Sequence, residues 1–193
     1  MLNLYSQYAD EYDIIVKELG FDAPKAEFVE FALQFLKKEH RILDVAAGSG
    51  DFGKRIKQQG EYNIDGLDPC KELLDIAKSN KIYNHYFNEY IRHDSRCSIP
   101  DESYDVIVSS GGFHPSQITP KELDEVLRMI KTNGILIFYY VSKKTDGFEA
   151  FLEEINAKIE ELINKSKIKE ISSKDKVNME LKYILRFSAF QKL

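Results

Sequence analysis

Short apolar runs and amphipathic segments alternate along most of the chain and predict a regular succession of strands and helices. Continuous apolar runs are typical of strands buried on both faces of a parallel sheet. Such runs lie at Arg41–Val45, Asn63–Leu67, Tyr104–Ser110 and Ile135–Val141, with a weaker strand within His85–Arg92. Apolar residues three or four positions apart predict helices at Pro24–Leu36, Asp51–Gln59, Cys70–Ser79 and 148–163.

Two further segments have clear local patterns. Thr119-Pro120-Lys121-Glu122 is a capping box with proline at the first helical position, so a helix is expected to begin there. We expect that helix to end at Asn133-Gly134. Residues 177–190 alternate between apolar and polar, Met179 and Leu181 being among the apolar positions, and this period of two predicts one exposed or antiparallel edge strand.

The alternation of strands and helices predicts the α/β class, with a doubly wound, mostly parallel sheet covered by helices on both faces. Ligands of such sheets bind beyond the carboxyl ends of the strands. The search for a site therefore narrows to the loops after residues 45, 67, 93, 110 and 141.

Composition excludes several classes of protein. The chain has 193 residues, which predicts one domain over residues 1–193. Its net charge of −5 argues against a nucleic-acid partner, and none of its apolar runs approaches the ~20 residues of a membrane span. Two cysteines, Cys70 and Cys97, suit a reducing compartment, and the first residues resemble no signal peptide. We expect a cytoplasmic protein without a membrane partner or a bound metal.

A glycine-rich loop follows the first predicted strand. Gly48, Gly50 and Gly53 form a G-x-G-x-x-G pattern, in which glycines allow a ligand to approach backbone N–H groups at the start of a helix. Asp68 lies 18 residues after Gly50, close to where dinucleotide-binding proteins place the acid that binds ribose. An NAD(P)-dependent oxidoreductase or a flavin enzyme is therefore one hypothesis.

Asp44 favours a different cofactor. It lies in the strand that leads into the glycine loop, where the dinucleotide pattern has an apolar residue. A buried carboxylate is costly unless hydrogen bonds or a positive charge compensate it. S-adenosylmethionine carries an ammonium and a sulfonium and no pyrophosphate, so an acid beside the loop would favour its binding.

Five segments together resemble the class I, seven-strand S-adenosylmethionine-dependent methyltransferases. They are YSQYADEYD at 5–13, ILDVAAGSG at 42–50, IDGLDP at 64–69, DESYDVIVS at 101–109 and KTNGILIF at 131–138. The resemblance implies a seven-stranded sheet with an antiparallel last strand, and S-adenosyl-L-methionine as the cofactor. The N-terminal lead-in and the SSGGFHP loop also resemble the methyltransferase-like proteins of the Williams–Beuren region.

The resemblance also implies roles for individual residues. Asp44 would orient the methionine end of the cofactor, while Ala46, Gly48 and Gly50 would bring the backbone close to it. Asp68, followed by Pro69, would accept hydrogen bonds from both ribose hydroxyls; its alternative role is to cap the next helix.

The later loops supply further candidates. Asp94 would bind the adenine amino group and Ser95 would offer a backbone N–H, unless this stretch is a surface turn. Ser109 ends the fourth strand and would line the cofactor. His114, in the following loop, is a candidate catalytic base because its ordinary pKa lies near 6.5; its alternative is a structural role.

The N-terminal segment is expected to be a helical lid over residues 1–38, before a Rossmann-like core at 39–193. Tyr5, Tyr8 and Tyr12 would share one helix face, with Tyr5 or Tyr12 touching the cofactor; alternatively, this face packs on the core. The lid and loops 111–119 and 142–147 would shape the acceptor pocket. We expect the lid to be mobile without ligand.

These features predict a methyltransferase that acts by in-line displacement on a small-molecule acceptor. The SSGGFHP loop lacks the N/D-P-P-Y/F and Pro-Cys patterns that resemble enzymes of amino and cytosine methylation. Methyl transfer to a protein side chain and a non-catalytic cofactor-binding partner subunit stay open as alternatives. The sequence leaves the oligomeric state open.

Overall fold

The fold is that of a computed structural model, which describes residues 2–20, 22–143, 147–178 and 183–193. The N-terminal part is helical. It comprises α1 (Leu2–Gln7), the 3-10 turn η1 (Ala9–Glu11), α2 (Tyr12–Glu18) and α3 (Asp22–Leu33). The remaining elements alternate through most of the chain. They are β1 (Arg41–Val45), α4 (Asp51–Lys57), β2 (Asn63–Leu67), α5 (Lys71–Ser79), β3 (Tyr86–Phe87), β4 (Tyr104–Ser109), η2 (Pro120–Glu122), α6 (Leu123–Met129), β5 (Ile130–Lys143), α7 (Glu149–Asn164), β6 (Ile168–Asn178) and β7 (Tyr183–Lys192).

Seven strands form one sheet in the order β3-β2-β1-β4-β5-β7-β6. Neighbours from β3 through β5 pair in parallel, whereas β7 runs antiparallel to both β5 and β6. The chain order reverses between β1 and β4, because β2 and β3 lie on one side of β1 and the later strands on the other. The predicted doubly wound sheet with an antiparallel last strand is confirmed, and its switch point lies between β1 and β4.

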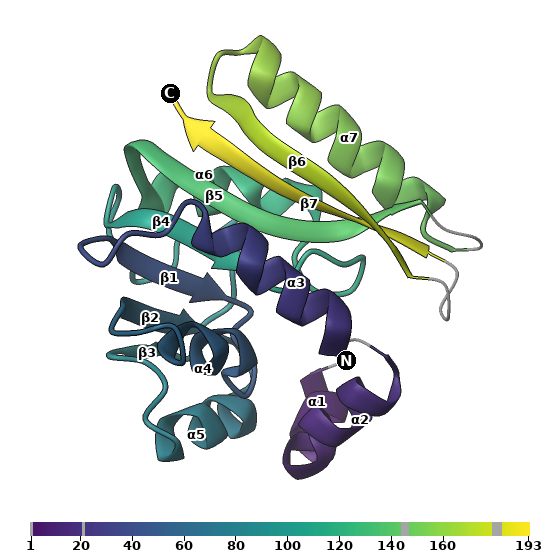
Figure 1. Ribbon diagram of the computed structural model, residues 1–193. Coiled ribbons are helices and arrows are strands. Elements are labelled where there is room, and N and C mark those ends of the chain that lie inside the picture. Colours follow the sequence, from purple (N-terminus) through teal and green to yellow (C-terminus); the bar gives the residue numbers. More distant parts are fainter. Residues whose placement is uncertain (1, 21, 144–146, 179–182) are drawn as a thin grey trace.

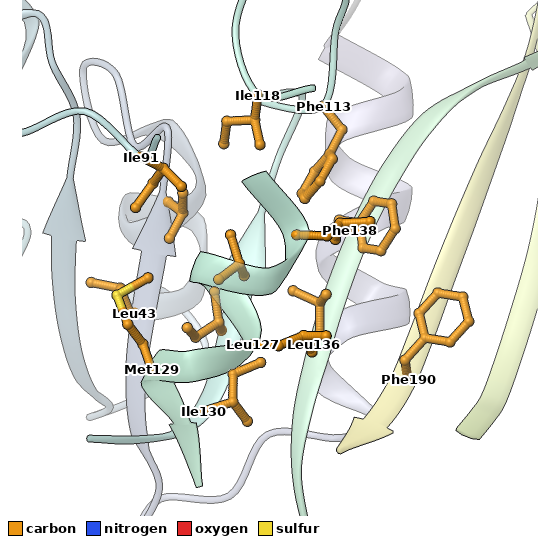
Figure 2. Packing of buried hydrophobic residues seen from close by; sticks show 14 of the residues in the cluster. Leu43, Ile91, Phe113, Ile118, Leu127, Met129, Ile130, Leu136, Phe138 and Phe190 are labelled. Carbon is orange, nitrogen blue, oxygen red and sulfur yellow. The ribbon is translucent and has the colours of Figure 1, made fainter. Parts of the chain in front are cut away.

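Helices cover both faces of the sheet, as predicted. One apolar cluster joins α6 and α7 to the sheet, and it includes Leu43, Leu127 and Phe138 (Figure 2). The other joins α3, α4 and α5 to the opposite face through residues such as Phe28 and Phe52. Figure 1 shows α3 in front of the sheet and α6 behind it. These two dry layers hold the strand ends in place, so the loops at the carboxyl edge stand on a rigid support.

Two predictions about the later elements are wrong. Residues 177–190 are not one strand: β6 and β7 both contribute, and Met179 and Leu181 lie outside the described residues. The helix after Thr119 ends at Met129 instead of Asn133-Gly134, because the buried Ile130 already pairs with Tyr104 of β4. The capping box itself is present, with Glu122 accepting hydrogen bonds from the Thr119 backbone and hydroxyl at 2.8 and 2.6 Å.

The N-terminal helices divide into two parts. Phe28 and Phe31 of α3 are buried and their rings contact Phe187 of β7, so α3 belongs to the core. Residues 2–18, which we call the lid, lie instead off the carboxyl ends of the strands (Figure 1). None of the described helices is both long and apolar enough to span a membrane.

Candidate functional site

A cavity of about 400 Å³ opens at the carboxyl ends of β1, β2 and β4, beside the switch point of the sheet. Six of the predicted site residues line it. They are Tyr5, Tyr12, Ala46, Gly48, Asp68 and Pro69. This volume lies within the range of about 300–1,000 Å³ that small-molecule sites occupy. We call it the first cavity.

Asp68 is the acidic residue of the first cavity, and it is only 7% exposed. Its Oδ2 accepts a hydrogen bond from the Gly48 N–H and its Oδ1 one from the Cys70 N–H, both at 2.8 Å. Burial raises the pKa of Asp68, although the two N–H donors oppose this rise. Each carboxylate oxygen has two lone pairs, so Asp68 can still accept from a ligand while it ties the glycine loop to the start of α5.

Gly48 and Gly50, the first two glycines of the G-x-G-x-x-G pattern, have different roles in the structure. Gly48 lines the cavity with a positive φ of 53°, and a Cβ there would stand 3.9 Å from the nearest atoms of Leu73 and Tyr12. Its lack of a side chain therefore leaves the cavity open to a ligand. Gly50 does not line the cavity. It has φ of 92° before α4 and packs under Ala77 and Ile82, so it serves the turn.

Asp44 precedes Val45, which lines the first cavity, but Asp44 itself is 1% exposed and lines neither cavity. Its Oδ2 accepts a hydrogen bond of 2.6 Å from the Tyr83 hydroxyl, whereas Oδ1 has no hydrogen-bond partner among the described residues. Burial raises the pKa of Asp44 to about 7, and the Tyr83 hydrogen bond opposes that rise. A buried carboxylate with an unused oxygen is what a cationic ligand would stabilise.

The lid covers the first cavity through a few polar contacts. Asp13 accepts a hydrogen bond of 2.5 Å from the Ser49 hydroxyl, and Ser6 donates one of 2.7 Å to Glu72. The Gln117 amide donates to the Tyr5 hydroxyl. These contacts join the lid to three separate loops or helices of the core.

Contrary to the prediction, Tyr5, Tyr8 and Tyr12 do not share one continuous helix face. The helix breaks after Gln7, so Tyr8 lies between α1 and η1 and is 41% exposed. Tyr5 and Tyr12 still approach each other, with ring centroids 5.7 Å apart in an edge-to-face arrangement. Both line the first cavity.

A second cavity of about 680 Å³ adjoins the first, between the lid, the carboxyl ends of β4 and β5 and the amino end of the antiparallel β7. The two share six lining residues, Tyr5, Tyr12, Ser110, Gly111, Ser116 and Gln117. Residues of loop 111–119 line it; of loop 142–147, residues 144–146 lie outside the described residues.

His114 lines the second cavity. Its Nδ1 lies 2.8 Å from the Ser116 hydroxyl, and its ring contacts Phe148 edge-on at 5.1 Å between centroids. Burial lowers the pKa of His114 below its ordinary 6.5, so the imidazole is neutral at neutral pH. A neutral imidazole can accept a proton from a bound molecule.

Five of the predicted residues line neither cavity: Asp44 and Gly50, described above, and also Asp94, Ser95 and Ser109. Asp94 and Ser95 are exposed, because β3 is only two residues long and the loop after it runs over the surface. Tyr90 and Ile91 from that loop line the first cavity in their place. Ser109 is fully buried, its hydroxyl has no hydrogen-bond partner among the described residues, and Ser110 takes its expected place.

Several residues that line the first cavity were not predicted from the sequence, although the positions of some of them could have indicated their place. Cys70 and Leu73 follow the ribose-type acid directly, so their position at the start of α5 could have indicated them. Gln117 gave no signal, because its place depends on how the 111–119 loop folds. Within the described residues, no group of three His, Cys, Asp or Glu side chains could hold a metal ion.

Comparisons with known proteins agree with this geometry. Residues 43–138 match the methyltransferase domain family. A ubiquinone/menaquinone biosynthesis C-methyltransferase of Rickettsia massiliae is 26% identical over 154 residues, which cover 76% of this chain and 62% of that protein. A ribosomal protein L11 methyltransferase of Dictyoglomus thermophilum is 30% identical over 138 residues, covering 71% of this chain and 44% of that protein.

The fold has close structural neighbours as well. A TehB-like SAM-dependent methyltransferase from Corynebacterium glutamicum has a TM-score of 0.65 and 19% identity, covering 99% of this chain and all of that one. A seven-stranded sheet of this order with a cavity at its switch point defines a class I Rossmann-like protein. Over residues 43–138 the chain carries a methyltransferase domain, and its fold is that of S-adenosylmethionine-dependent methyltransferases, which together imply S-adenosyl-L-methionine as the cofactor. It spans 62% of the length of the Rickettsia relative.

The first cavity fits this cofactor. Asp68 keeps acceptor capacity for hydroxyl groups, and Gly48 leaves room for a ligand where any other residue would place a Cβ. Leu73 and Ile91 supply an apolar surface for a flat ring. Asp44, in the strand before the same loop, keeps an unused Oδ1, and a cationic ligand would favour its ionised form whereas a pyrophosphate would not.

Proposed function

We propose that the chain transfers a methyl group to a small-molecule acceptor that binds in the second cavity. The observation that carries this proposal is that the two cavities adjoin and share lining residues under one lid. A donor in the first and an acceptor in the second would meet at that junction. When bound, S-adenosylmethionine supplies an electrophilic methyl group attached to a good leaving group. Positioning of the reactants can then supply a large share of the acceleration.

The chain's own residues would divide the work of binding. Asp68 would hold the two ribose hydroxyls, and Gly48 would let the backbone approach the cofactor, with Ala46 and Pro69 beside them. Asp44 would favour the cationic methionine end from the strand before the loop. Tyr5 and Tyr12 would close the cavity against water.

His114 would act as a general base for an acceptor that arrives protonated. It lines the second cavity, and burial keeps it neutral and able to take a proton. The hydrogen bond between its Nδ1 and Ser116 would fix the ring orientation. An acceptor that is already deprotonated would need no such base.

A protein acceptor is the second candidate, since one relative is a ribosomal protein methyltransferase. The second cavity favours a small molecule, because its volume of about 680 Å³ lies in the range of small-molecule sites. A non-catalytic role as a cofactor-binding partner subunit is the third candidate. The narrower resemblance to the methyltransferase-like proteins of the Williams–Beuren region stays a prediction.

A methyl-labelling experiment separates these candidates. The protein is incubated with S-[methyl-³H]adenosylmethionine and an extract of its source cells, and label is counted in the organic-soluble, aqueous small-molecule and protein fractions. We expect label in a small-molecule fraction, and much less of it with the Asp68→Ala variant at a cofactor concentration below saturation. Label in the protein fraction would favour the second candidate, and label in no fraction from protein that binds S-adenosylhomocysteine would favour the third.

A further inference from the structure

The second cavity has a polar end and an apolar body. The residues that it shares with the first cavity carry hydroxyl groups or an amide, or are glycine. Away from this junction the lining is dominated by aliphatic and aromatic side chains of α2 and its C-cap, β5 and β7, among them Val16, Leu19, Val141 and Leu185. The polarity therefore changes along the length of the cavity.

The described lining of the second cavity also contains few charged side chains. No carboxylate lines it within the part of the chain that the structure describes. Lys25 is the one lysine or arginine among its described lining residues, and its ammonium lies 3.7 Å from the Asp51 carboxylate of α4. A charged molecule in the cavity would lose its hydration without gaining a free counter-charge, which is costly.

We propose that the acceptor is an uncharged, largely apolar molecule whose one polar group lies at the junction and whose body extends along α2 toward β7. This inference rests on the proposed function and adds the substrate class. The nucleophilic atom belongs to the polar group or to an atom beside it, since only that end reaches the first cavity. The apolar body contacts Val16 of the lid and Leu19 directly after it, so acceptor binding and lid closure support each other.

Matched naphthalene probes test the substrate class in protein saturated with S-adenosylhomocysteine. The neutral probe is 2-naphthol, the anion is 2-naphthalenesulfonate and the cation is (2-naphthylmethyl)trimethylammonium, so ring size stays constant and charge changes. We expect 2-naphthol to bind at least about tenfold more tightly than either ion. Equal or tighter binding of the anion or the cation would overturn the proposal, since it would reveal a counter-charge or an aromatic cage.

Lid variants test the location. Val16→Lys places a charge in the wall of the second cavity, whereas Ile14→Lys alters the same helix at a position that is 59% exposed and lines neither cavity. We expect Val16→Lys to weaken 2-naphthol binding at least about tenfold and Ile14→Lys to leave it within about twofold. Leu19→Lys, at a 52% exposed lining position, repeats the test with little risk to folding.

The affinity for S-adenosylhomocysteine separates a failure of the proposed function from a failure of the proposed substrate class. Val16 and Leu19 line only the second cavity, so both variants are expected to keep that affinity. If wild-type protein fails to bind S-adenosylhomocysteine, the proposed function fails. If it binds but 2-naphthol is not preferred, or is insensitive to both lining variants, only the substrate class is overturned.

Discussion

The hydroxyl of Tyr83 donates a 2.6 Å hydrogen bond to the buried carboxylate of Asp44, joining the segment after α5 to the strand before the glycine loop. Two glycines make room for this contact. A Cβ on Gly53 or on Gly66 would lie 2.5 Å from the Tyr83 ring. Gly53, the third glycine of the G-x-G-x-x-G pattern, thus accommodates a tyrosine that holds Asp44, and the pattern does not require a dinucleotide.

The stability of the unliganded protein should depend on pH through Asp44. Because its pKa is raised to about 7, folded Asp44 keeps its proton between about pH 4 and pH 7 while the unfolded chain has lost it. The Asp44 contribution to the free energy of unfolding therefore falls as pH rises through this window, by at most about 1.4 kcal/mol per pH unit.

Asp44→Asn removes that dependence. Urea unfolding at several pH values gives the free energy of unfolding of both proteins. The value for Asp44→Asn minus the value for wild type should rise steadily from about pH 5 to about pH 7. A difference that stays constant with pH would contradict the raised pKa of Asp44, whatever the absolute stabilities are.

Cofactor affinity should have the opposite pH dependence. The ammonium of S-adenosylhomocysteine favours ionised Asp44, so binding should tighten as pH rises through about 7. Asp68, Asp51 and Lys25 face the same carboxyl group, the first two raising its pKa and Lys25 lowering it. Tyr83→Phe removes a hydrogen bond to the ionised form, so the midpoint of the affinity profile should move to higher pH.

Calorimetry across this pH range measures the midpoint. Tyr62→Phe is the control, because Tyr62 precedes the amino end of β2, whereas Asp44 lies near the carboxyl end of β1. A purely structural role for Tyr83 predicts a lower Tm and an unchanged midpoint. That pattern would refute its action on Asp44.

Asp68→Ala should weaken S-adenosylhomocysteine binding by about 1.5–3 kcal/mol, the usual worth of hydrogen bonds to a charged group. Part of the loss would arise because Asp68 also holds the Gly48 and Cys70 N–H groups. Asp94→Ala is a matched control, since Asp94 is exposed and lines neither cavity. An equal loss in both variants would mean that the loop after β3 approaches the cofactor after all.

The lid should exchange its amide hydrogens faster than the core and slow down when S-adenosylhomocysteine binds. It is held by a few polar contacts, and Ala9 is its one buried apolar residue among the described side chains. Hydrogen exchange measured by mass spectrometry over residues 2–18 tests this, with α3 as the internal reference.

Two variants sharpen the lid prediction. Ser49→Ala removes the hydrogen bond to Asp13 and Gln117→Ala the one to Tyr5, so both should speed exchange in the lid without lowering the Tm of the core. Identical protection of the lid with and without ligand would place it in the core as a permanent layer.

The sequence predicts this fold well where apolar runs are continuous. β1, β2 and β4 are close to their predicted bounds, because strands buried on both faces leave an unambiguous pattern. The two C-terminal strands were merged, since β6 is mostly exposed and its polar run gives no strand pattern. The end of α6 was misplaced because pairing of Ile130 with β4 overrides the local signal of Asn133-Gly134.

For the site, local motifs predict what the backbone controls. Gly48, Asp68 and Pro69 line the first cavity because they directly follow strand ends. Asp94 and Ser95 were misplaced because the loop after β3 has no regular spacing that fixes it. The Tyr83–Asp44 contact was unpredictable, since the two residues are 39 positions apart and meet only when α4 and β2 pack around the ring.

The most direct test of the whole account is calorimetry of the wild-type protein with S-adenosylhomocysteine and with NAD in parallel. We expect one site of micromolar affinity for S-adenosylhomocysteine and no heat with NAD. At 100 times its dissociation constant, S-adenosylhomocysteine should raise the free energy of unfolding by about 2.7 kcal/mol. Saturable binding of NAD without a response to S-adenosylhomocysteine would contradict the account.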